Sequence, residues 1–556
     1  MSSPSREDFV RLVERHRSGD KTLAVPMSVR LLGDQLTPVL AYRRLVAPDE
    51  RTAPSFLLES VEGGERQGRY SILSSRPVIE VVAYSADNDN QRVEIADRRE
   101  HPELAEAMEA QADEDNPLFV PRAISRQFHL VIPPSPSPRD ELPRAFLGGW
   151  VGFAAYDTVR YAEPDKLAFA TAPKDDRGLP TLHFGFYDGV VIFDHVDKLV
   201  HVVQMALVGP DQDAGEAYDK AQARLEYRVE EIQLHTKPLP SGRVDADRAP
   251  TPLASNTTRE AHAAMVARAM EYIRAGDIFQ VVVGQRFERT SRVDPFDVYR
   301  ALRAVNPSPY MGYIQAQWCI LVASSPEILC RVRTTDAKRV VTNRPLAGTR
   351  RRGATPEEDL ALERELLADQ KERAEHIMLV DLGRNDVGQV AVPGTIELAK
   401  VMEIERYSHV MHISSTVTGE LRPDLDCWDA LRAALPVGTI SGAPKVRAMQ
   451  IIDELEPVRR GPYGGGFGYV GLDGQMDIAL ALRTIVVPVD LAQGVDSPSP
   501  SWTYHIQSAG GIVADSNAPD EYQETVNKAA ALSRAIDVAE QAFHAPAPGS
   551  FSLPRP

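Results

Sequence analysis

The sequence contains few cysteines, and their positions indicate neither a metal site nor a disulfide framework. Only three occur among the 556 residues, Cys319, Cys330 and Cys427, and they lack the short spacings of zinc ligands. An odd number of cysteines cannot pair completely, which favours a reducing compartment. No stretch approaches the ~20 apolar residues that cross a bilayer, and the opening MSSPSREDFV lacks the apolar core of a signal peptide. We therefore expect a cytoplasmic protein with no membrane partner.

The chain has fewer basic residues than acidic ones. The 62 lysines and arginines are outnumbered by 79 aspartates and glutamates, which gives a net charge of −17 at pH 7. A surface of this sign repels phosphate groups, so nucleic acids and anionic membranes are excluded as expected partners. Hydrophobic residues make up 43% and charged residues 25%, as in ordinary globular proteins. The length predicts two or more structural units.

The sequence shows no internal repeat, no phosphate-binding loop and no regular alternation of strands with helices. Strand-like runs dominate its first half, where 182–195 and 198–209 resemble two strands joined by a short turn. In the second half, Thr257 and Glu260 form a capping box at the start of a helix that Gly276 ends. Another long helix is expected from about Pro356 through residue 375. Strands with short links and helices in blocks predict an α+β fold with antiparallel sheets.

The strongest break in the chain is a stretch rich in proline and serine at 236–256, TKPLPSGRVDADRAPTPLASN. It lacks apolar periodicity, so it predicts a linker. We place the main boundary there, between an N-terminal region, 1–250, and a second domain, 255–543. The last residues, 544–556, resemble a disordered tail. Whether the two regions form separate units or interleave is left open by the sequence.

Two short helical patterns each carry glutamates three residues apart, Glu372 with Glu375 and Glu521 with Glu524. Residues at i and i+3 share one helix face, so each pair can present two carboxylates to one point. Four converging carboxylates require a neutralising cation, and oxygen ligands of this kind suit Mg²⁺. The alternative is that these are ordinary solvated glutamates, with Glu524 paired to Lys528 for about 0.2–0.5 kcal/mol.

Several stretches after residue 275 are too polar and too rich in glycine for plain core elements. They are GDIFQVV (276–282), ASSPEIL (323–329), RPLAGTRRRG (344–353), KERAEHIMLVDLGRND (371–386), GTISGAPKVRAM (438–449), RRGPYGGGFGYVG (459–471), ALRTIVV (481–487) and AGGIVADS (509–516). In this order they resemble the chorismate-utilising enzymes, and within them component I of anthranilate synthase. The resemblance covers nearly all of 255–540. It implies antiparallel sheets packed face to face with helices on the outside.

The resemblance assigns the glutamates to Mg²⁺, which holds the ring carboxylate of chorismate. Glu375 and Glu524 match the direct ligands, and Glu372 and Glu521 complete the set. Tyr463 and Arg483 match residues that grip the enolpyruvyl carboxylate, and an arginine fork can bond both of its oxygens. The remaining positions expected at the substrate are Gly510, Gly511, Lys528, Thr349 and Thr439.

Two residues match the catalytic groups of the family. Glu327 would protonate the departing ring hydroxyl, and burial can raise the pKa of a glutamate enough for that task. His412 would remove the ring proton, for which a neutral imidazole is suited. The competing histidines are His409 and His376, and His376 matches a supporting position more closely.

Two neutral residues distinguish this chain from members of the family that catalyse other reactions. Relatives that add water resemble it but carry lysine at the position of Gln280, and an amide cannot act as that base. The 4-amino-4-deoxychorismate synthases typically carry lysine at the position of Ala347, which here offers no nucleophile. Both positions indicate anthranilate as the product. The alternative interpretations are 4-amino-4-deoxychorismate synthase component I, isochorismate synthase and a catalytically silent protein that binds chorismate or tryptophan as a sensor.

An N-terminal stretch, FLLESVEGGERQGRYSIL (56–73), resembles the feedback element of the family, where tryptophan binds as an inhibitor. A second stretch, NPSPYMGY (306–313), supplies the facing wall. The residues expected around this ligand are Leu58, Glu59, Ser60, Pro309, Tyr310, Met311, Phe467 and Tyr469. The alternative is a strand and a turn that simply pack together.

No glutaminase domain is expected within this sequence. None of the three cysteines lies in a glycine-flanked nucleophile turn, and too few residues remain for a fused amidotransferase. The resemblance therefore implies a separate glutamine amidotransferase subunit, and hence a hetero-oligomer that delivers ammonia internally.

Overall fold

A computed structural model gives the structure of the chain. It describes residues 4–17, 19–47, 53–62, 66–85, 92–97, 116–135, 141–234, 239–242, 244, 251–407, 410–489 and 501–544. The predicted tail, apart from His544, and most of the predicted linker lie outside the described residues, as does His409.

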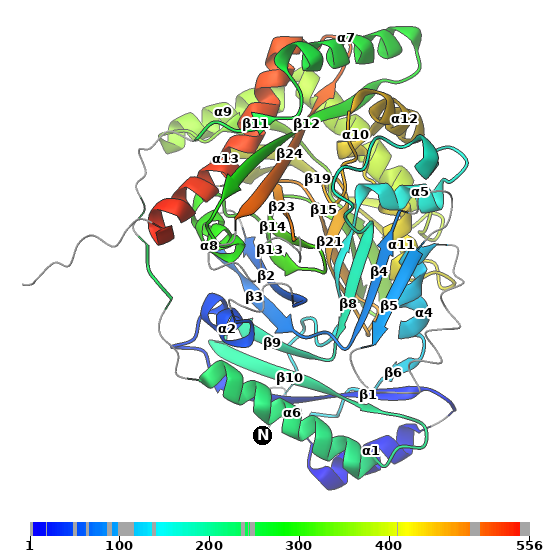
Figure 1. Ribbon diagram of the computed structural model, residues 1–556. Coiled ribbons are helices and arrows are strands. Elements are labelled where there is room, and N and C mark those ends of the chain that lie inside the picture. The colour runs from blue at the N-terminus through cyan, green and yellow to red at the C-terminus, as the bar shows by residue number, and fades with distance from the viewer. Residues whose placement is uncertain are drawn as a thin grey trace, which may run out of the picture.

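Two large sheets form the centre of the molecule (Figure 1). The first sheet has 13 strands, and β1 pairs with β6 in parallel while the remaining strand pairs are antiparallel. In spatial order its strands are β11 (Ala254–Ser255), β12 (Gln280–Ser291), β24 (Trp502–Ile512), β23 (Thr484–Pro488), β14 (Cys319–Ser325), β13 (Tyr310–Gln315), β2 (Ser55–Glu62), β3 (Arg66–Ser75), β9 (Gly189–Asp194), β10 (Leu199–Val208), β1 (Thr22–Leu32) and β6 (Phe128–Leu130), with β20 (Gly442–Ala443) beside β12.

The second sheet has 11 antiparallel strands. In spatial order they are β17 (Leu346–Arg351), β19 (Val410–Glu420), β16 (Lys338–Asn343), β15 (Ile328–Thr335), β22 (Met476–Leu480), β21 (Gly466–Gly471), β7 (Gly149–Ala154), β8 (Leu182–Tyr187), β4 (Ile79–Tyr84) and β5 (Arg92–Asp97), with β18 (Glu397–Arg406) beside β19. Both sheets contain strands from before and after the predicted linker, so the two regions interleave. The domain boundary at about residue 250 stays a prediction.

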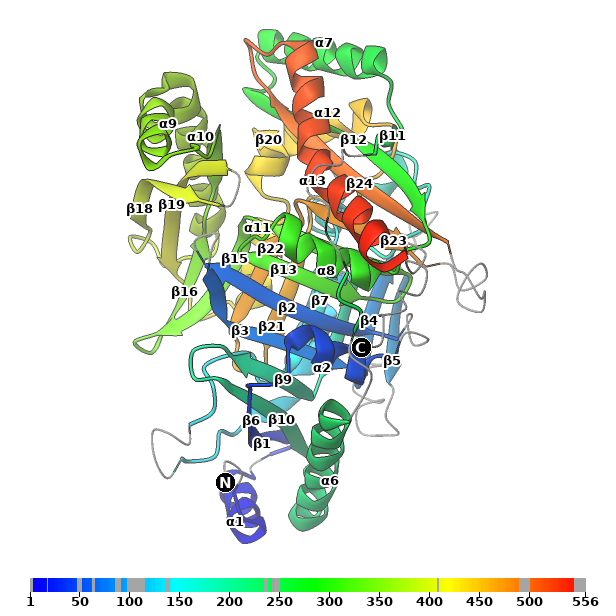
Figure 2. The same cartoon turned by 90° about the vertical axis from the view of Figure 1, so that its left-hand side faces the viewer.

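The helices cover the outer faces of the sheets, as Figures 1 and 2 show. They are α1 (Arg6–His16), α2 (Pro38–Leu45), α4 (Val120–Ser125), α5 (Val159–Ala162), α6 (Ala214–Gln233), α7 (Arg259–Ala275), α8 (Pro295–Val305), α9 (Pro356–Ala368), α10 (Gln370–Gly388), α11 (Cys427–Ala434), α12 (Lys445–Leu455) and α13 (Ala518–His544). Among the described residues, no helix is long and apolar enough to cross a membrane.

The inner faces of the two sheets share one apolar core. Phe56 and Ile314 of the first sheet pack with Phe153 and Phe467 of the second, and burial of such side chains contributes about 1.5–3 kcal/mol each. On the outer face of the first sheet, helices α1, α2, α6, α8 and α13 bury their apolar sides. The predicted α+β fold, with sheets face to face and helices outside, is confirmed.

Three sequence-based predictions about local structure are wrong. The run 182–195 is not one strand: Asp188 separates β8 in the second sheet from β9 in the first. Helix α7 is capped by Thr258, whose hydroxyl accepts from the backbone of Ala261, while Gly276 ends it as expected. The long helix from Pro356 is broken at Asp369.

Asp369 ends α9 and begins α10 because its extended backbone breaks the helical hydrogen bonds. Its carboxylate accepts from the backbone N–H groups of Lys371 and Glu372, at 3.0 and 3.2 Å, and satisfies donors that the helix start leaves free. Helix α10 therefore starts directly before its glutamate pair. It is a separate helix from α9, so the direction of α9 does not set the orientation of the pair.

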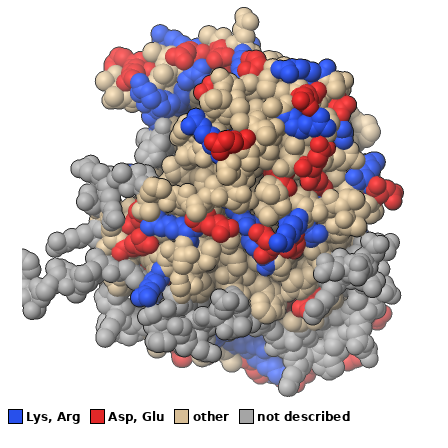
Figure 3. Space-filling model, turned by 45° about the horizontal axis from the view of Figure 1, so that its top comes forward, with Lys and Arg blue, Asp and Glu red and all other residues tan. Residues whose placement is uncertain are grey.

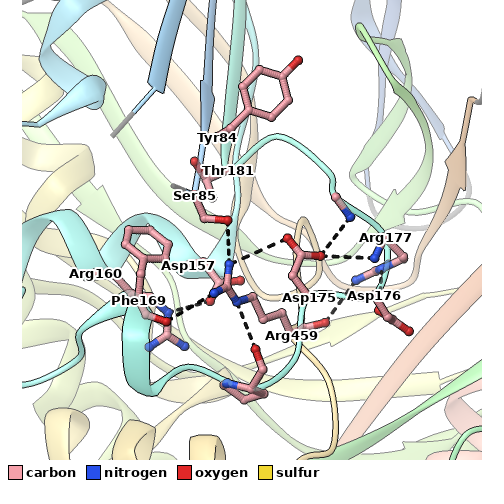
Figure 4. Close-up of polar contacts among 12 residues, drawn as sticks. Tyr84, Ser85, Asp157, Arg160, Phe169, Asp175, Asp176, Arg177, Thr181 and Arg459 are labelled. Atoms are coloured by element: carbon pink, nitrogen blue, oxygen red, sulfur yellow. Dashed lines mark hydrogen bonds and ion pairs between the residues drawn. The ribbon is translucent and has the colours of Figure 1, made fainter. Parts of the chain in front are cut away.

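Hydrogen bonds join the loop at 169–177, in the N-terminal region, to the segment that precedes β21 (Figure 4). Arg459 donates to the carbonyl oxygens of Pro173 and Phe169 and to the hydroxyl of Ser85, at 3.1, 3.3 and 2.6 Å. Arg177 donates in turn to the carbonyl oxygens of Arg459 and Arg460, at 3.2 and 3.0 Å. The polar loop at 169–177 thus holds a segment that lies far away in the sequence.

Basic and acidic side chains lie side by side on the molecular face that Figure 3 shows. The exposed ion pairs of the protein include Arg268 with Glu454 and Lys371 with Asp515. Exposed pairs of this kind contribute about 0–1 kcal/mol each.

Candidate functional site

Hydrogen bonds and close contacts between predicted residues bring six elements together: β12, β17, β19, β24, α10 and α13. Figure 2 shows α10, β18 and β19 on one side of this region and α13, β12 and β24 on the other. Most of the predicted substrate, metal and catalytic residues lie on these six elements, and the exceptions are Glu327, Thr439, Tyr463 and Arg483.

Glu327 is buried between β14 and β15, with 3% of its surface exposed. The hydroxyl of Thr439 donates to its carboxylate at 3.0 Å, and the backbone of Leu346 contributes a second bond. Desolvation outweighs both bonds and raises the pKa of Glu327 from 4.5 to about 8. This side chain is therefore protonated at pH 7 and can donate a proton.

His412 is buried on β19, and its hydrogen bonds define its tautomer. Nδ1 lies 3.0 Å from the carbonyl oxygen of Gly348, and because a carbonyl can only accept, Nδ1 carries the proton. Nε2 then holds the lone pair, and among the described residues it has no hydrogen-bond partner. Desolvation and the nearby Arg483 lower the pKa of His412 to about 4, so the ring is neutral at pH 7.

A bulge in β17 aims the Gly348 carbonyl at this histidine. The register with β19 shifts between Ala347 and Thr349, and Gly348 has a φ of 65°, which favours glycine. A Cβ atom at this position would lie 3.2 Å from a carboxylate oxygen of Glu372. The bulge also brings the Thr349 hydroxyl within 3.1 Å of His412 Nδ1.

Arg483 has a strained backbone and no anionic partner among the described residues. Its φ of 44° lies in the left-handed region, which is unfavourable for residues other than glycine and is often found at functional sites. Burial lowers the pKa of its guanidinium. The electrostatic neighbours of this group include His412 and Tyr407. A desolvated guanidinium of this kind is suited to binding a carboxylate.

The first glutamate pair lies on α10. Glu375 accepts from the Gln280 amide at 2.9 Å, and Arg350 donates to Glu372 at 3.2 Å. Burial raises the pKa of Glu375, and the negative charges of Glu372 and Glu524 add to the rise. The side chains of both pairs thus interact electrostatically.

The second pair lies in the first turns of α13. Ser516 donates to one oxygen of Glu521 at 2.7 Å, while its other oxygen, Oε2, is buried and has no partner among the described residues. Burial and the charge of Glu524 raise the pKa of Glu521. Lys528 contacts Glu524 at 2.6 Å and donates to the Ala509 carbonyl oxygen at 2.8 Å.

In the described part of the chain, no three His, Cys, Asp or Glu side chains form a ready-made cation site. Glu372 and Glu524 are each held by a basic side chain, Arg350 and Lys528. The residues nevertheless fit a hard divalent cation, because the two helices offer oxygen ligands alone and one buried oxygen of Glu521 is unpaired. Burial is the main cause of the raised pKa values of Glu375 and Glu521, and the smaller contribution from neighbouring carboxylates is a repulsion that a cation would relieve.

Glycines provide space beside the carboxylates. Gly510 and Gly511 lie on β24 opposite Val283 and Val282 of β12. A Cβ atom on Gly510 would lie 3.1 Å from Glu521 Oε2, and one on Gly511 would lie 2.7 Å from the Gln280 amide nitrogen.

Other predicted residues lie around this centre. Tyr463 is buried, and its hydroxyl bonds to the backbone of Ala509. His376 lies on α10 with Nε2 2.6 Å from the Ser415 hydroxyl, so it contacts a neighbouring strand. Ala347 lies on β17 opposite Ile413.

A separate cavity of about 940 Å³ lies between β2, β13 and β21. All eight predicted inhibitor residues line it: Leu58, Glu59, Ser60, Pro309, Tyr310, Met311, Phe467 and Tyr469. Their role in binding stays a prediction. Glu59 already accepts three hydrogen bonds, from Ser71, Tyr299 and Arg303, and forms an ion pair with Arg303, so a ligand ammonium would compete with these groups for the carboxylate.

The sequence analysis missed Tyr407. This buried residue packs on His412 with ring centroids 5.6 Å apart, and its hydroxyl donates to Glu405 at 2.7 Å. It also lines the 940 Å³ cavity, so it separates that cavity from the predicted base. Its position in the same YSHVMH motif as His412 was the available signal.

Comparisons with known proteins show the family of the chain. Residues 54–534 match the family model described as chorismate binding enzyme. The chain is 50% identical over 552 residues to anthranilate synthase alpha subunit 2, chloroplastic, of Arabidopsis thaliana, which covers 97% of the chain and 85% of the relative. It is 42% identical to anthranilate synthase component 1 of Pseudomonas aeruginosa over 97% of the chain and 99% of the relative.

A solved structure has the same fold. The crystal structure of anthranilate synthase component I from Streptococcus pneumoniae TIGR4 aligns with a TM-score of 0.63 at 32% identity. The alignment covers 91% of this chain and 99% of that chain.

The raised pKa of Glu327 predicts a specific dependence of stability on pH. Between about 4.5 and about 8, Glu327 is protonated in the folded state and ionised in the unfolded state, so its contribution to stability is lost as pH rises. Glu327→Gln cannot ionise, and its stability relative to the wild type should therefore increase across this range. Thermal midpoints of both proteins from pH 4.5 to 8.5 measure this difference, and a difference independent of pH would contradict the assignment.

Proposed function

Because the chain belongs to the chorismate-binding enzyme family and, within it, to component I of anthranilate synthase, we propose how its residues carry out that enzyme's reaction. The protein is the large subunit of anthranilate synthase, which converts chorismate and ammonia to anthranilate and pyruvate in the first step of tryptophan biosynthesis. The roles of individual residues, of Mg²⁺ and of tryptophan are proposals.

The observation that carries the mechanism is the opposite protonation of two buried groups. Glu327 holds a proton at pH 7, because its pKa is about 8, and His412 is free of one on Nε2, because its pKa is about 4. A reaction that needs an acid in one step and a base in the next requires such a pair.

In the first step, ammonia forms a carbon–nitrogen bond to the ring while the ring hydroxyl leaves. Glu327 gives its proton to the departing hydroxyl, which leaves as water. The bond from Thr439 holds the carboxyl group in place and stabilises the carboxylate that forms.

In the second step, His412 removes a ring proton through Nε2, and the enolpyruvyl group leaves as the enolate of pyruvate while the ring becomes aromatic. The enolate then takes up a proton to give pyruvate. The Gly348 carbonyl fixes the required tautomer and accepts the hydrogen bond of the imidazolium that forms. Positioned acids and bases of this kind each contribute roughly 10²–10⁴ in rate.

Two further groups bind the substrate carboxylates. Arg483 lacks an anionic partner among the described residues, and with Tyr463 it would bind the enolpyruvyl carboxylate. Glu375 and Glu524, with Glu372 and Glu521, would hold Mg²⁺, which offsets their charge when the ring carboxylate binds. Lys528 would join this charge network through Glu524.

The neutral residues select ammonia. Gln280 donates to Glu375 with its amide, and an amide cannot deprotonate water as a lysine can. Ala347 offers no amine for covalent attack. Ammonia would come from a separate glutamine amidotransferase subunit in a cytoplasmic hetero-oligomer.

The product identifies the reaction directly. Incubation of the protein with chorismate, Mg²⁺ and ammonium should yield anthranilate and pyruvate in equal amounts, which mass spectrometry can measure. Aminodeoxychorismate, isochorismate or unchanged chorismate would each contradict the assignment and select a different function.

Glu375→Gln should abolish turnover and weaken Mg²⁺ binding at least tenfold, because one charged oxygen ligand is lost. The control is Glu357→Gln, which neutralises a first-turn glutamate of α9. Isothermal titration with Mg²⁺ measures binding apart from activity. Full activity without added metal, or equal Mg²⁺ binding by both variants, would contradict the proposed metal site.

We also propose that tryptophan binds in the 940 Å³ cavity and inhibits the enzyme. Met311 faces this cavity from β13, where it pairs with Glu59 of β2, and Gly312 leaves room for the Phe467 ring. Aromatic and sulfur-containing side chains of this kind suit an indole.

Tryptophan should raise the KM for chorismate by about 5–150-fold, the usual range of coupling between two sites. Met311→Ala should weaken tryptophan binding about tenfold or more, because a buried side chain of this size contributes about 1.5–3 kcal/mol. Met27→Ala, which alters a buried methionine of β1, is the control. Steady-state kinetics test the proposal, and a KM unchanged by saturating tryptophan would contradict it.

A further inference from the structure

Arg460 is a fully buried arginine outside the set of residues that the reaction uses directly. Its guanidinium forms a two-pronged pair with Glu456: Nε donates to Oε2 at 2.9 Å and Nη2 donates to Oε1 at 2.6 Å. Both side chains are nearly inaccessible to solvent. Glu456 Oε1 also accepts from the backbone N–H of Gly284 at 2.9 Å.

The remaining N–H groups of Arg460 contact two segments of the site. Nη1 donates to the carbonyl oxygen of Ile440 at 2.6 Å, and Nη2 donates to that of Val282 at 2.7 Å. The guanidinium also lies 4.7 Å from the ring centre of Tyr156 and 6.0 Å from that of Tyr463. One side chain thus joins the loop after α11, strand β12 and the segment before β21.

Each contacted segment carries a residue of the proposed mechanism. Ile440 follows Thr439, which donates to Glu327. Val282 lies two residues after Gln280, which donates to Glu375. Arg460 itself touches neither carboxylate, so it can act on them only through the backbone.

We propose that Arg460, held in place by Glu456, is a positioning residue that keeps Thr439 aligned with the acid Glu327. This inference rests on the proposed role of Glu327. The guanidinium is suited to the task because its planar fork offers five N–H donors in fixed directions, so one group can hold a carboxylate and two carbonyl oxygens at once. A lysine offers three donors from one point and cannot reproduce this arrangement.

A purely structural arginine is available for comparison in Arg160. It is equally buried and is bound to Asp157 and to Asp453, and Asp453 lies on the same helix, α12, that ends directly before Glu456. Its hydrogen bonds end on these two carboxylates rather than on the backbone of a site residue.

Steady-state kinetics of matched lysine variants separate the two roles. Arg460→Lys should lower kcat about tenfold to hundredfold, because small misplacements in an active site have effects of this size, while KM for chorismate changes less than threefold. Arg160→Lys should change kcat less than threefold at a similar loss of thermal stability. Equal effects of the two substitutions on kcat would overturn the proposal.

A double-mutant cycle tests whether Arg460 acts through Thr439. In a Thr439→Val background, Arg460→Lys should cause less than a threefold further loss of kcat, because the bond that it aligns is already absent. Multiplicative losses would overturn the inference. If Arg460→Lys does not fold, Glu456→Gln replaces it in the cycle. This substitution keeps the shape of residue 456 and weakens its hydrogen bonds to the Arg460 guanidinium.

The outcome is separable from that of the proposed function. A wild-type protein that forms no anthranilate refutes the function. A wild-type protein that forms anthranilate, with multiplicative effects of Arg460 and Thr439, refutes only the positioning role.

Discussion

Exclusion of water from charged groups is the constraint on which this site depends. Burial makes Glu327 hold its proton and keeps His412 neutral at pH 7. In water a glutamate would be almost fully ionised at this pH and a histidine partly protonated, so burial turns the two groups into a ready acid and a ready base. Burial likewise lowers the pKa of Arg483 and raises the pKa values of Glu375 and Glu521. These shifts favour an anion at the arginine and a cation at the glutamates.

Interleaving of the chain joins its two regions into continuous sheets. Strand β13 pairs with β2, and β21 pairs with β7, so strands of the N-terminal region continue both sheets of the catalytic half. The loop at 169–177 then covers the segment before Tyr463, with Arg286 and Asp176 joined in a charged pair at its edge. Neither half could bury its strand edges alone.

Part of the construction of the site could be predicted from the sequence, and part could not. The spacing of Glu372 and Glu375 on one helix face follows from helical geometry, and the structure confirms that α10 carries both. Their partner Arg350 could not be predicted, because it comes from a separate strand. The break at Asp369 was hidden within a helix-forming pattern. The division at Asp188 was hidden because β8 and β9 are buried on both faces, which removes the alternation that marks a strand.

The proposed regulatory cavity and the catalytic site are adjacent, and some residues and strands contact both. Tyr407 lines the cavity on one side and packs on His412 on the other. Strand β21 carries Phe467 into the cavity and begins three residues after Tyr463. Strand β21 is held on both sides, because it pairs with β7 over residues 466–471 and with β22 over residues 466–470. A ligand that moved either wall would therefore act on the proposed base or on the carboxylate-binding residues, so packing offers a route for coupling between the two proposed sites.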